Sequence, residues 1–305
     1  MSSSFFMSNY LLNLFELIMK TKLIILLTPL LLCACKFQGI SKLQDQGIPE
    51  PLEIFSDYGA FLGRSDNDVK NFSNYNYVSC ELDEFSDTNI ARLKSKNTHL
   101  LAYLNVGALE NYRDYYDDYE SLTFKDYDNW PDERWIDVSN TSWQNFVINN
   151  LAQGFKDRQA FGVYLDNIDV YTIAKEEGKD YNAFALGLKN IIKGISDLGL
   201  FVMINGGAEF LVDMNNQEDN IFDSIWAYHQ EEVFSLITDY EHDGFGTQNQ
   251  DDTEYYQGIA AMMKGKGKQV FFLEYTTDNS LIGTIAVYCD LHKYHYYISN
   301  NVDLK

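Results

Sequence analysis

Two carboxylates follow a short apolar segment in the middle of the chain. The segment Gly162 to Leu165 lacks the polar/apolar alternation of a half-exposed strand, which is typical of a strand covered on both faces in a parallel sheet. Asp166 follows it directly, and Asp169 comes three residues later. Ligands of α/β proteins bind at the carboxyl ends of such strands. Asp166 is therefore a candidate for chemistry, whereas Asp169 is explained equally well as a helix cap.

Polar side chains also follow the other apolar segments of the chain. In chain order they are Glu81 and Asp83, then Asn105 and Glu110, then Asn205, then Glu231 and Glu232, and finally Glu274 and Tyr275. Tyrosines such as Tyr103 and Tyr164 are interleaved with them, as is common where sugar rings are bound, although packing in the core explains any single one as well. Glycoside hydrolysis typically uses two carboxyl groups that flank the glycosidic bond to be cleaved.

The residues that other chemistries need are absent from the sequence. It has no His-Glu-x-x-His pair, no cysteine pair at zinc spacing, no phosphate-binding glycine-rich loop and no Gly-x-Ser-x-Gly motif. The five histidines are scattered, and only His229 falls near the candidate residues. We therefore expect neither a metal ion nor a cofactor.

The pattern of apolar segments indicates how these residues are brought together. Amphipathic helices are predicted around 143–151, 184–195 and 281–291, between apolar segments of strand length. Eight strands with intervening helices fit a closed (β/α)8 TIM barrel in a single domain better than an open doubly wound sheet, and they would place the candidate residues on one rim. The expected strands are Tyr58–Leu62, Tyr77–Leu82, Leu100–Val106, Gly162–Leu165, Leu200–Ile204, Ser224–Tyr228, Val270–Tyr275 and Tyr294–Ile298.

The composition limits the class of partner. The 305 residues carry a formal net charge of −22, which argues against nucleic acid or an anionic membrane surface as the partner. A cationic substrate would be favoured, although acidity that serves only solubility explains the charge as well. We expect a monomer.

The amino terminus has the features of an export signal. A short basic head at 19–22 precedes an apolar run at 23–32, which is too short to span a bilayer. The run ends in Leu32-Cys33-Ala34-Cys35, which resembles a bacterial lipobox, so residues 1–34 are expected to be a signal peptide that starts at Met1 or Met19. Residues 35–54 would be the lipidated Cys35 and a tether that anchors the domain, residues 55–305, to the outside of a bacterial membrane. An ordinary cleaved signal is the alternative, and the remaining Cys80 and Cys289 are expected to be buried.

Four segments in a fixed order resemble glycoside hydrolase family 114, the endo-α-1,4-polygalactosaminidases, which are (β/α)8 barrels. The segments are Ala102 to Arg113, Trp135 to Val138, Phe161 to Asp169 and Ile225 to Phe234, and the resemblance extends over about residues 57–300. It implies hydrolysis inside chains of α-1,4-linked galactosamine or N-acetylgalactosamine, without a metal and with retention of the anomeric configuration. The substrate would be a cationic, galactosamine-rich polysaccharide.

The resemblance also implies roles for single residues. The essential Asp falls on Asp166 and the essential Glu on Glu231, with Glu232 as a competitor because the spacing of this segment differs from the family pattern. Either member of the pair can be the nucleophile, and if Glu231 is the acid its pKa should be raised by burial, Asp166 and Glu232. The residues expected to bind the sugar are Asp169, Glu110, Asn105, Tyr103, Asn205, Glu274, Tyr275 and Asp83.

Two other functions are compatible with the same residues. The first is a surface lipoprotein that binds amino-sugar polymers without cutting them, and the second is a hydrolase of a different, neutral α-linked polysaccharide. Chain shortening separates the first from an enzyme, and the salt dependence of turnover separates the second from an enzyme acting on a cationic polymer.

Overall fold

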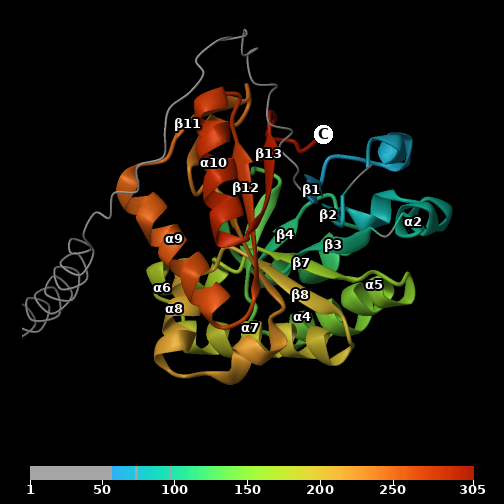
Figure 1. Cartoon of the computed structure of the whole chain (residues 1–305). Helices are drawn as coiled ribbons and strands as arrows, with labels where there is room; N and C mark the ends of the chain where they lie inside the picture. Colours follow the sequence, from blue (N-terminus) through green and yellow to red (C-terminus); the bar gives the residue numbers. More distant parts are fainter. Residues whose placement is uncertain (1–56, 73–74, 97) are drawn as a thin grey trace, which may run out of the picture. The chain divides into compact units, whose positions relative to one another are not determined.

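Eight parallel strands form the centre of the protein, whose structure is a computed structural model that describes residues 57–72, 75–96 and 98–305. They pair in the order β1-β2-β3-β7-β8-β9-β12-β13, and β13 lies against β1, so that the sheet is a nearly closed barrel with helices on its outside (Figure 1). The predicted (β/α)8 barrel is thereby confirmed. The barrel strands are β1 (Tyr58–Phe61), β2 (Tyr77–Cys80), β3 (His99–Asn105), β7 (Gly162–Asp166), β8 (Phe201–Asn205), β9 (Ala227–Glu231), β12 (Gln269–Tyr275) and β13 (His295–Ser299).

Helices, short turns and two small sheets connect these strands. The helical elements are η1 (Asp66–Asn71), η2 (Leu82–Glu84), α2 (Asp87–Lys94), α3 (Tyr116–Tyr119), η3 (Glu120–Leu122), α4 (Thr141–Phe146), η4 (Val147–Ala152), α5 (Gln153–Asp157), α6 (Val170–Glu176), α7 (Tyr181–Asp197), α8 (Ala208–Asn216), η5 (Asn220–Ser224), α9 (Gln250–Gly265) and α10 (Asn279–His292). The small sheets are β4 (Ala108–Glu110), β6 (Glu133–Ile136) and β5 (Thr123–Asp126), and the hairpin of β10 (Ser235–Asp239) with β11 (Gly244–Thr247).

Alternation along each strand divides the core into two layers. In β12, Phe271, Leu273 and Tyr275 belong to the cluster inside the barrel, whereas Val270 and Phe272 belong to the cluster between the strands and the helices. Successive strand residues point to opposite faces of a sheet, so this parity decides which rim residues can face the interior. By the same parity Asn105, Asp166, Asn205 and Glu231 face inward at the ends of β3, β7, β8 and β9.

All eight predicted strands are present, and one of them is displaced along the sequence. The strand predicted at 224–228 is β9, which begins at Ala227 and ends at Glu231. Ser224 ends the turn η5, and Ile225 packs in the outer cluster instead of pairing in the sheet. The apolar pattern continues through this turn into the strand, which is why the sequence placed the strand too early. Glu231 is consequently the last residue of a strand, as Asp166 is.

The predicted helices are also present, with differences at their ends. The segment expected around 143–151 is one run of α4, η4 and α5, in which η4 has π-helical hydrogen bonding, and its cap is the side chain of Asn140. α7 is capped by Asp180, and the chain leaves it through Gly199 at a φ of 89°. Asp278 caps α10.

The two small sheets were not predicted, and they extend over the carboxyl side of the barrel. Cys80 and Cys289 are free and buried, as expected. The predicted signal peptide, the lipidation site Cys35 and the tether at 35–54 lie outside the described residues. Within the described part of the chain, no helix is both long and apolar enough to cross a membrane.

Candidate active site

Three neighbouring barrel strands end in polar side chains that meet inside the rim. Asp166 ends β7, Asn205 ends β8 and Glu231 ends β9, and these strands pair side by side in the sheet. The Nδ2 atom of Asn205 donates to Oδ1 of Asp166 at 2.9 Å and to Oε1 of Glu231 at 2.7 Å. The two carboxylates predicted as a pair therefore share one amide group.

Three tyrosine hydroxyl groups hold the same two carboxylates. Tyr103 donates to Oδ2 of Asp166 at 2.9 Å. Tyr164 donates to Oε1 of Glu231 at 3.1 Å, and Tyr275 donates to Oε2 at 2.6 Å. The backbone N–H of Asn167 adds a bond to Oδ1 of Asp166 at 2.9 Å. Each carboxylate thus accepts three hydrogen bonds, which fixes its orientation.

A buried histidine orients the shared amide. Nδ1 of His229 lies 2.7 Å from Oδ1 of Asn205, an oxygen that can only accept, so the proton of the ring is on Nδ1. Burial lowers the pKa of His229 to about 3, which keeps the ring neutral. Its Nε2 atom is buried without a hydrogen-bond partner in the part of the chain that the structure describes. Because its oxygen is engaged, Asn205 presents its NH2 group to both carboxylates.

Burial and mutual repulsion change the protonation of the pair. Burial, then the charge of Asp166, and to a smaller extent that of Glu232, raise the pKa of Glu231 to about 7 against the donors Tyr275 and Asn205. This confirms the raised pKa predicted for Glu231. Burial raises the pKa of Asp166 also, while Asn205, Tyr103 and the Asn167 backbone oppose the rise. Glu231 can consequently hold a proton to donate at neutral pH.

The neighbouring Glu232 is directed elsewhere. Its backbone has a φ of 56°, so the chain turns away from the strand direction directly after Glu231. One of its carboxylate oxygens accepts from the backbone N–H of Ile237 in β10. Glu232 lines the same cavity as Asp166 and Glu231, but its carboxylate is bonded to β10. The inward position on β9 belongs to Glu231.

The pair lies between two adjoining cavities. We call the first, of about 250 Å³, the inner cavity; its wall includes Asp166, Glu231, Asp169, Glu133 and Tyr240. The second, the middle cavity of about 390 Å³, also includes Asp166, Glu231 and Glu133 in its wall and extends toward Glu81 and Tyr112. Both carboxylates are therefore accessible to a ligand that runs across the rim.

Asp169 occupies the N-cap position of α6, but its side chain is bonded to the residue that precedes α8. Both of its carboxylate oxygens lie 3.1 Å from the backbone N–H of Gly207, which precedes α8. Gly206 and Gly207 have φ values of 65° and 71°, and a β-carbon at Gly206 would lie 2.3 Å from the Asp169 carboxylate, so this approach requires glycine. Burial raises the pKa of Asp169 to about 6. Asp169 borders the inner cavity and supports its wall.

Glu274 does not reach the site, and the prediction that it contacts the sugar is wrong. By the alternation of β12 it faces the outer layer, and it is 0% exposed. Its carboxylate accepts from the backbone N–H groups of Phe234 and Ser235 and from the Ser235 hydroxyl, at 2.6 to 3.2 Å. Glu274 ties the segment that follows β9 to the barrel.

Three other expected sugar contacts have protein partners. Oδ1 of Asn105 accepts from Ala108, and its Nδ2 donates to Glu133, so it supports the rim instead of binding a ligand. Glu110 is buried and pairs with Arg113. Asp83 pairs with Arg158 at 3.2 Å and has a side chain that is 60% exposed, outside the inner and middle cavities.

Sequence reasoning missed Glu133, which is the third carboxyl group, after Asp166 and Glu231, that borders both cavities. It is the first residue of β6, and its Oε2 atom accepts from Asn105 at 3.0 Å and from Asn167 at 3.3 Å. Burial, followed by the charges of Asp166 and Glu110, raises its pKa to about 8. The only sequence signal was its place two residues before the segment Trp135 to Val138. It does not follow a barrel strand, so a search of the residues at the carboxyl ends of the strands did not find it.

Comparisons with known proteins agree with the fold of the chain. The model of glycoside-hydrolase family GH114 matches residues 58–300. The glycoside hydrolase domain of PelA from Pseudomonas aeruginosa superposes with a TM-score of 0.67 at 16% identity, covering 81% of this chain and 95% of that one. Ega3 of Aspergillus fumigatus, in a complex with galactosamine, gives a TM-score of 0.63 at 16% identity over 83% of this chain and 93% of that one.

One relative is similar to this chain in sequence. An uncharacterized protein of Methanocaldococcus jannaschii is 22% identical over 245 residues, which cover 70% of this chain. The match covers 65% of that protein, so this chain spans less than two thirds of its length.

Proposed function

The chain belongs to glycoside-hydrolase family GH114 and is a glycoside hydrolase, and from this premise we propose that it cleaves chains of α-1,4-linked galactosamine internally with Asp166 and Glu231 as its catalytic pair. One observation carries the assignment of the pair: a single amide, that of Asn205, donates to both carboxylates at the junction of two cavities. Two carboxyl groups so arranged can act on opposite ends of one glycosidic bond.

The mechanism has two steps. In the first, a carboxylate oxygen of Asp166 attacks the anomeric carbon, and Glu231 gives its proton to the leaving oxygen as the glycosidic bond breaks. A covalent ester between Asp166 and the sugar results. In the second, Glu231 removes a proton from water, whose oxygen attacks the same carbon and releases Asp166. The anomeric configuration is retained because it is inverted twice.

The environment of each residue supports these roles. Glu231, with a pKa raised to about 7, keeps a proton to donate at neutral pH and can take one back from water. Asp166 accepts three hydrogen bonds that favour its charged form, as a nucleophile requires. Activity should consequently decrease as the pH rises above about 7, where Glu231 loses its proton.

The separation of the pair supports retention. An oxygen of each carboxylate lies within hydrogen-bond distance of the same nitrogen, at 2.9 and 2.7 Å. Retaining enzymes have carboxyl groups about 5–5.5 Å apart, whereas inverting enzymes leave room for a water molecule at about 6.5–9.5 Å. Two groups bridged by one amide correspond to the shorter separation.

Excess carboxylate around the pair supports a cationic substrate. Glu133 and Asp169 border the inner cavity beside the catalytic pair. Burial raises the pKa of Glu133 to about 8, and an ammonium group beside this carboxyl group would offset the cost of its charged form. The solved structure of Ega3, which has a similar fold, contains galactosamine. An amino sugar with a free amine fits such a site better than a neutral sugar does.

The test is hydrolysis of a galactosamine polymer by the wild-type protein, Asp166→Asn and Glu231→Gln. We expect chain shortening by the wild type and a loss of at least about a thousandfold in kcat for each variant. With an aryl galactosaminide that has a good leaving group, Glu231→Gln should recover more activity than Asp166→Asn, because such a group needs no acid. Full activity of either variant on the polymer excludes that residue from the mechanism.

The same assay separates the two alternative functions. Binding of the polymer without chain shortening by the wild type would identify a receptor. Cleavage of a neutral α-linked polymer with a rate that does not change with salt would identify a different substrate, since attraction between a cationic chain and an acidic site weakens as the ionic strength rises.

A further inference from the structure

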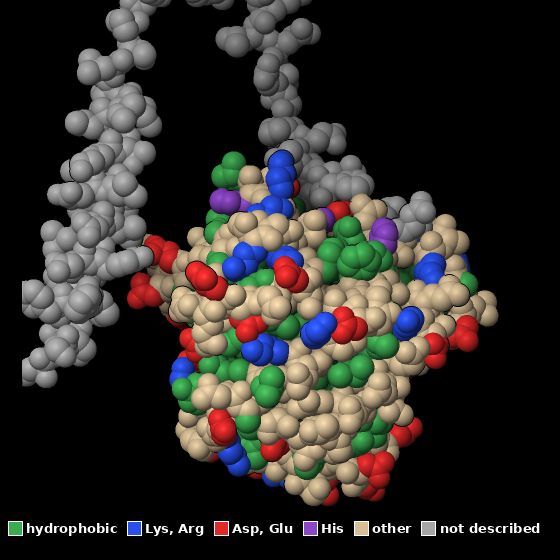
Figure 2. Space-filling model, turned by 90° about the horizontal axis from the view of Figure 1, so that it is seen from below, with side chains coloured by type: hydrophobic (Ala, Val, Ile, Leu, Met, Phe, Trp, Pro, Cys, Tyr) green, Lys and Arg blue, Asp and Glu red, His purple; other side chains and the backbone are tan. Residues whose placement is uncertain are grey.

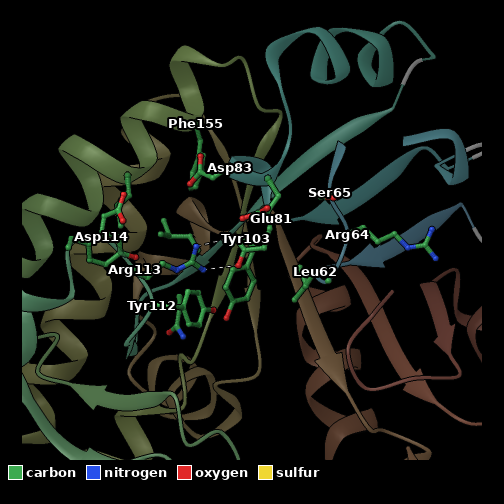
Figure 3. A pocket seen from close by; sticks show the side chains of 16 residues that line it. Leu62, Arg64, Ser65, Glu81, Asp83, Tyr103, Tyr112, Arg113, Asp114 and Phe155 are labelled. Carbon is green, nitrogen blue, oxygen red and sulfur yellow. Dashed lines mark hydrogen bonds and ion pairs between the residues drawn. The ribbon is translucent and has the colours of Figure 1, made fainter. Parts of the chain in front are cut away.

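A third cavity continues from the middle cavity away from the catalytic pair. This outer cavity, of about 590 Å³, is bordered by the segments that follow β1, β2 and β3 and by residues 112–115. Figure 3 shows Glu81, Tyr103, Tyr112 and Arg113 gathered in it, while Arg64 points away from them. Apart from Tyr103, which holds Asp166, its side chains have no part in the two steps described above.

The outer and middle cavities share a wall. Leu62, Gly63, Glu81, Tyr103 and Tyr112 border both of them. The middle cavity in turn contains Asp166 and Glu231. A linear chain that occupies the catalytic centre can therefore extend past Tyr103 into the outer cavity.

Tyr112 is the side chain at this junction whose properties point to a ligand. It is 62% exposed, which is unusual for a large aromatic ring. Its hydroxyl nevertheless donates to Oε1 of the buried Glu110 at 2.9 Å, and the guanidinium of Arg113 lies 5.1 Å from the ring centroid. The ring is thus open to solvent but held in one orientation.

The charges behind Tyr112 are compensated within the protein. Arg113 bonds to Glu110, and it donates to the two carboxylate oxygens of Glu81 at 2.7 and 3.3 Å. Burial raises the pKa of Glu81 to about 7 in spite of Arg113. The exposed charged groups that remain around the cavity include Asp83, Glu84 and Asp114, so its outer edge is acidic.

We propose that the outer cavity binds further amino-sugar units of the same chain, with the ring of Tyr112 as the surface on which one unit stacks. The apolar face of a sugar ring packs on an immobilised aromatic ring at a small cost in side-chain entropy. The acidic edge attracts the ammonium groups that such units carry. This inference rests on the proposed substrate, and it assigns to the enzyme a binding site remote from the cleaved bond.

The test measures binding in an inactive background. Galactosamine oligosaccharides of increasing length are titrated into Glu231→Gln by calorimetry, with and without the additional change Tyr112→Ala. The affinity of Glu231→Gln should rise with chain length until the outer cavity is filled. Tyr112→Ala should weaken binding of the long oligosaccharides about tenfold and leave that of the shortest binding member unchanged.

Two control variants test whether the weaker binding of Tyr112→Ala comes from a structural change instead of the loss of the ring. Tyr112→Phe keeps the ring and loses only the bond to Glu110, so binding of long chains should stay within about threefold. Tyr181→Ala removes another exposed tyrosine, one that borders none of the three cavities, and should change nothing. Melting temperatures of all variants show whether they are folded.

The possible failures differ from one another. If no galactosamine oligosaccharide binds Glu231→Gln, the proposed substrate is wrong and the inference is overturned with it. If the oligosaccharides bind but Tyr112→Ala weakens short and long chains equally, or neither, the proposed function stands and the outer cavity is not a sugar site.

Discussion

At the scale of single residues, Asn205 is the centre of the candidate site. Its NH2 group serves Asp166 and Glu231, and its oxygen is occupied by His229. The sequence indicated Asn205 as a sugar contact, because it follows a strand, but its bonds to both members of the pair depend on three strands lying next to one another. Parity along β9 likewise gives the inward position to Glu231 instead of Glu232.

Replacement of Asn205 by alanine should change the pH profile as well as the rate. The amide lowers the pKa of both carboxyl groups, so its loss should raise both pKa values and move both limbs of the kcat/KM profile to higher pH. We expect kcat to decrease about a hundredfold because the pair loses its common donor. A profile that keeps its position in a folded variant would contradict this role for Asn205.

At the scale of elements, the site depends on close contact between connections that follow neighbouring strands. Gly107 joins β3 to β4 and lies against Asn167, which follows β7 and donates to Asp166 and Glu133. A β-carbon at Gly107 would lie 1.8 Å from the carbonyl oxygen of Asn167, a backbone atom that cannot move aside alone. The contact explains why glycine stands at this position.

Gly107→Ala should therefore lower both stability and activity. We expect a loss of about 1–3 kcal/mol in the free energy of unfolding from overpacking, and at least a tenfold decrease in kcat because Asn167 is displaced. Urea denaturation and polymer hydrolysis measure the two effects.

Gly154→Ala is the matched control for this prediction. Gly154 lies in α5, and a β-carbon there would meet nothing within 4 Å. Alanine should stabilise the helix by about 0.5–1 kcal/mol without changing activity. Equal effects of the two substitutions would show that the approach of Gly107 to Asn167 does not matter.

At the scale of the whole molecule, negative charge is not simply spread over the surface for solubility. On the face in Figure 2, Lys and Arg side chains lie among Asp and Glu side chains. Inside the fold, in contrast, carboxyl groups gather where their pKa values are raised by burial: Asp169 to about 6, Glu81, Glu231 and Glu274 to about 7, and Glu133 to about 8. Four of them, Glu81, Glu133, Asp169 and Glu231, border the three cavities and are kept there at the expense of stability, whereas Glu274 ties the segment after β9 to the barrel.

Stability should consequently decrease as the pH rises from about 5 to about 8. Each of these groups has a higher pKa in the folded chain than in the unfolded chain, so over this range the folded chain holds more protons and unfolding becomes more favourable as protons are lost. Melting temperatures at pH 5 and pH 8 measure the effect.

Glu133→Gln should make this dependence shallower, because a neutral amide replaces a group that must be desolvated when charged. The exposed Glu254→Gln provides the control and should leave the slope unchanged. A melting temperature that rises with pH, or an equal slope in Glu133→Gln and the wild type, would contradict the raised pKa values.

The sequence by itself determined the eight strands, the main helices and Asp166 as a candidate site residue. Apolar periodicity, helix caps and the residue that follows a strand are local properties of the chain. The sequence could not determine which rim carboxylates meet. Glu274 lies at the carboxyl end of a barrel strand, but it is one residue away from the inward-facing positions Leu273 and Tyr275 and so faces outward. Glu133 follows no barrel strand, because it comes from a small sheet that covers the rim. Asp166 and Glu231 are bridged by Asn205 because β7, β8 and β9 lie side by side in the barrel, and only the tertiary structure brings these strands together.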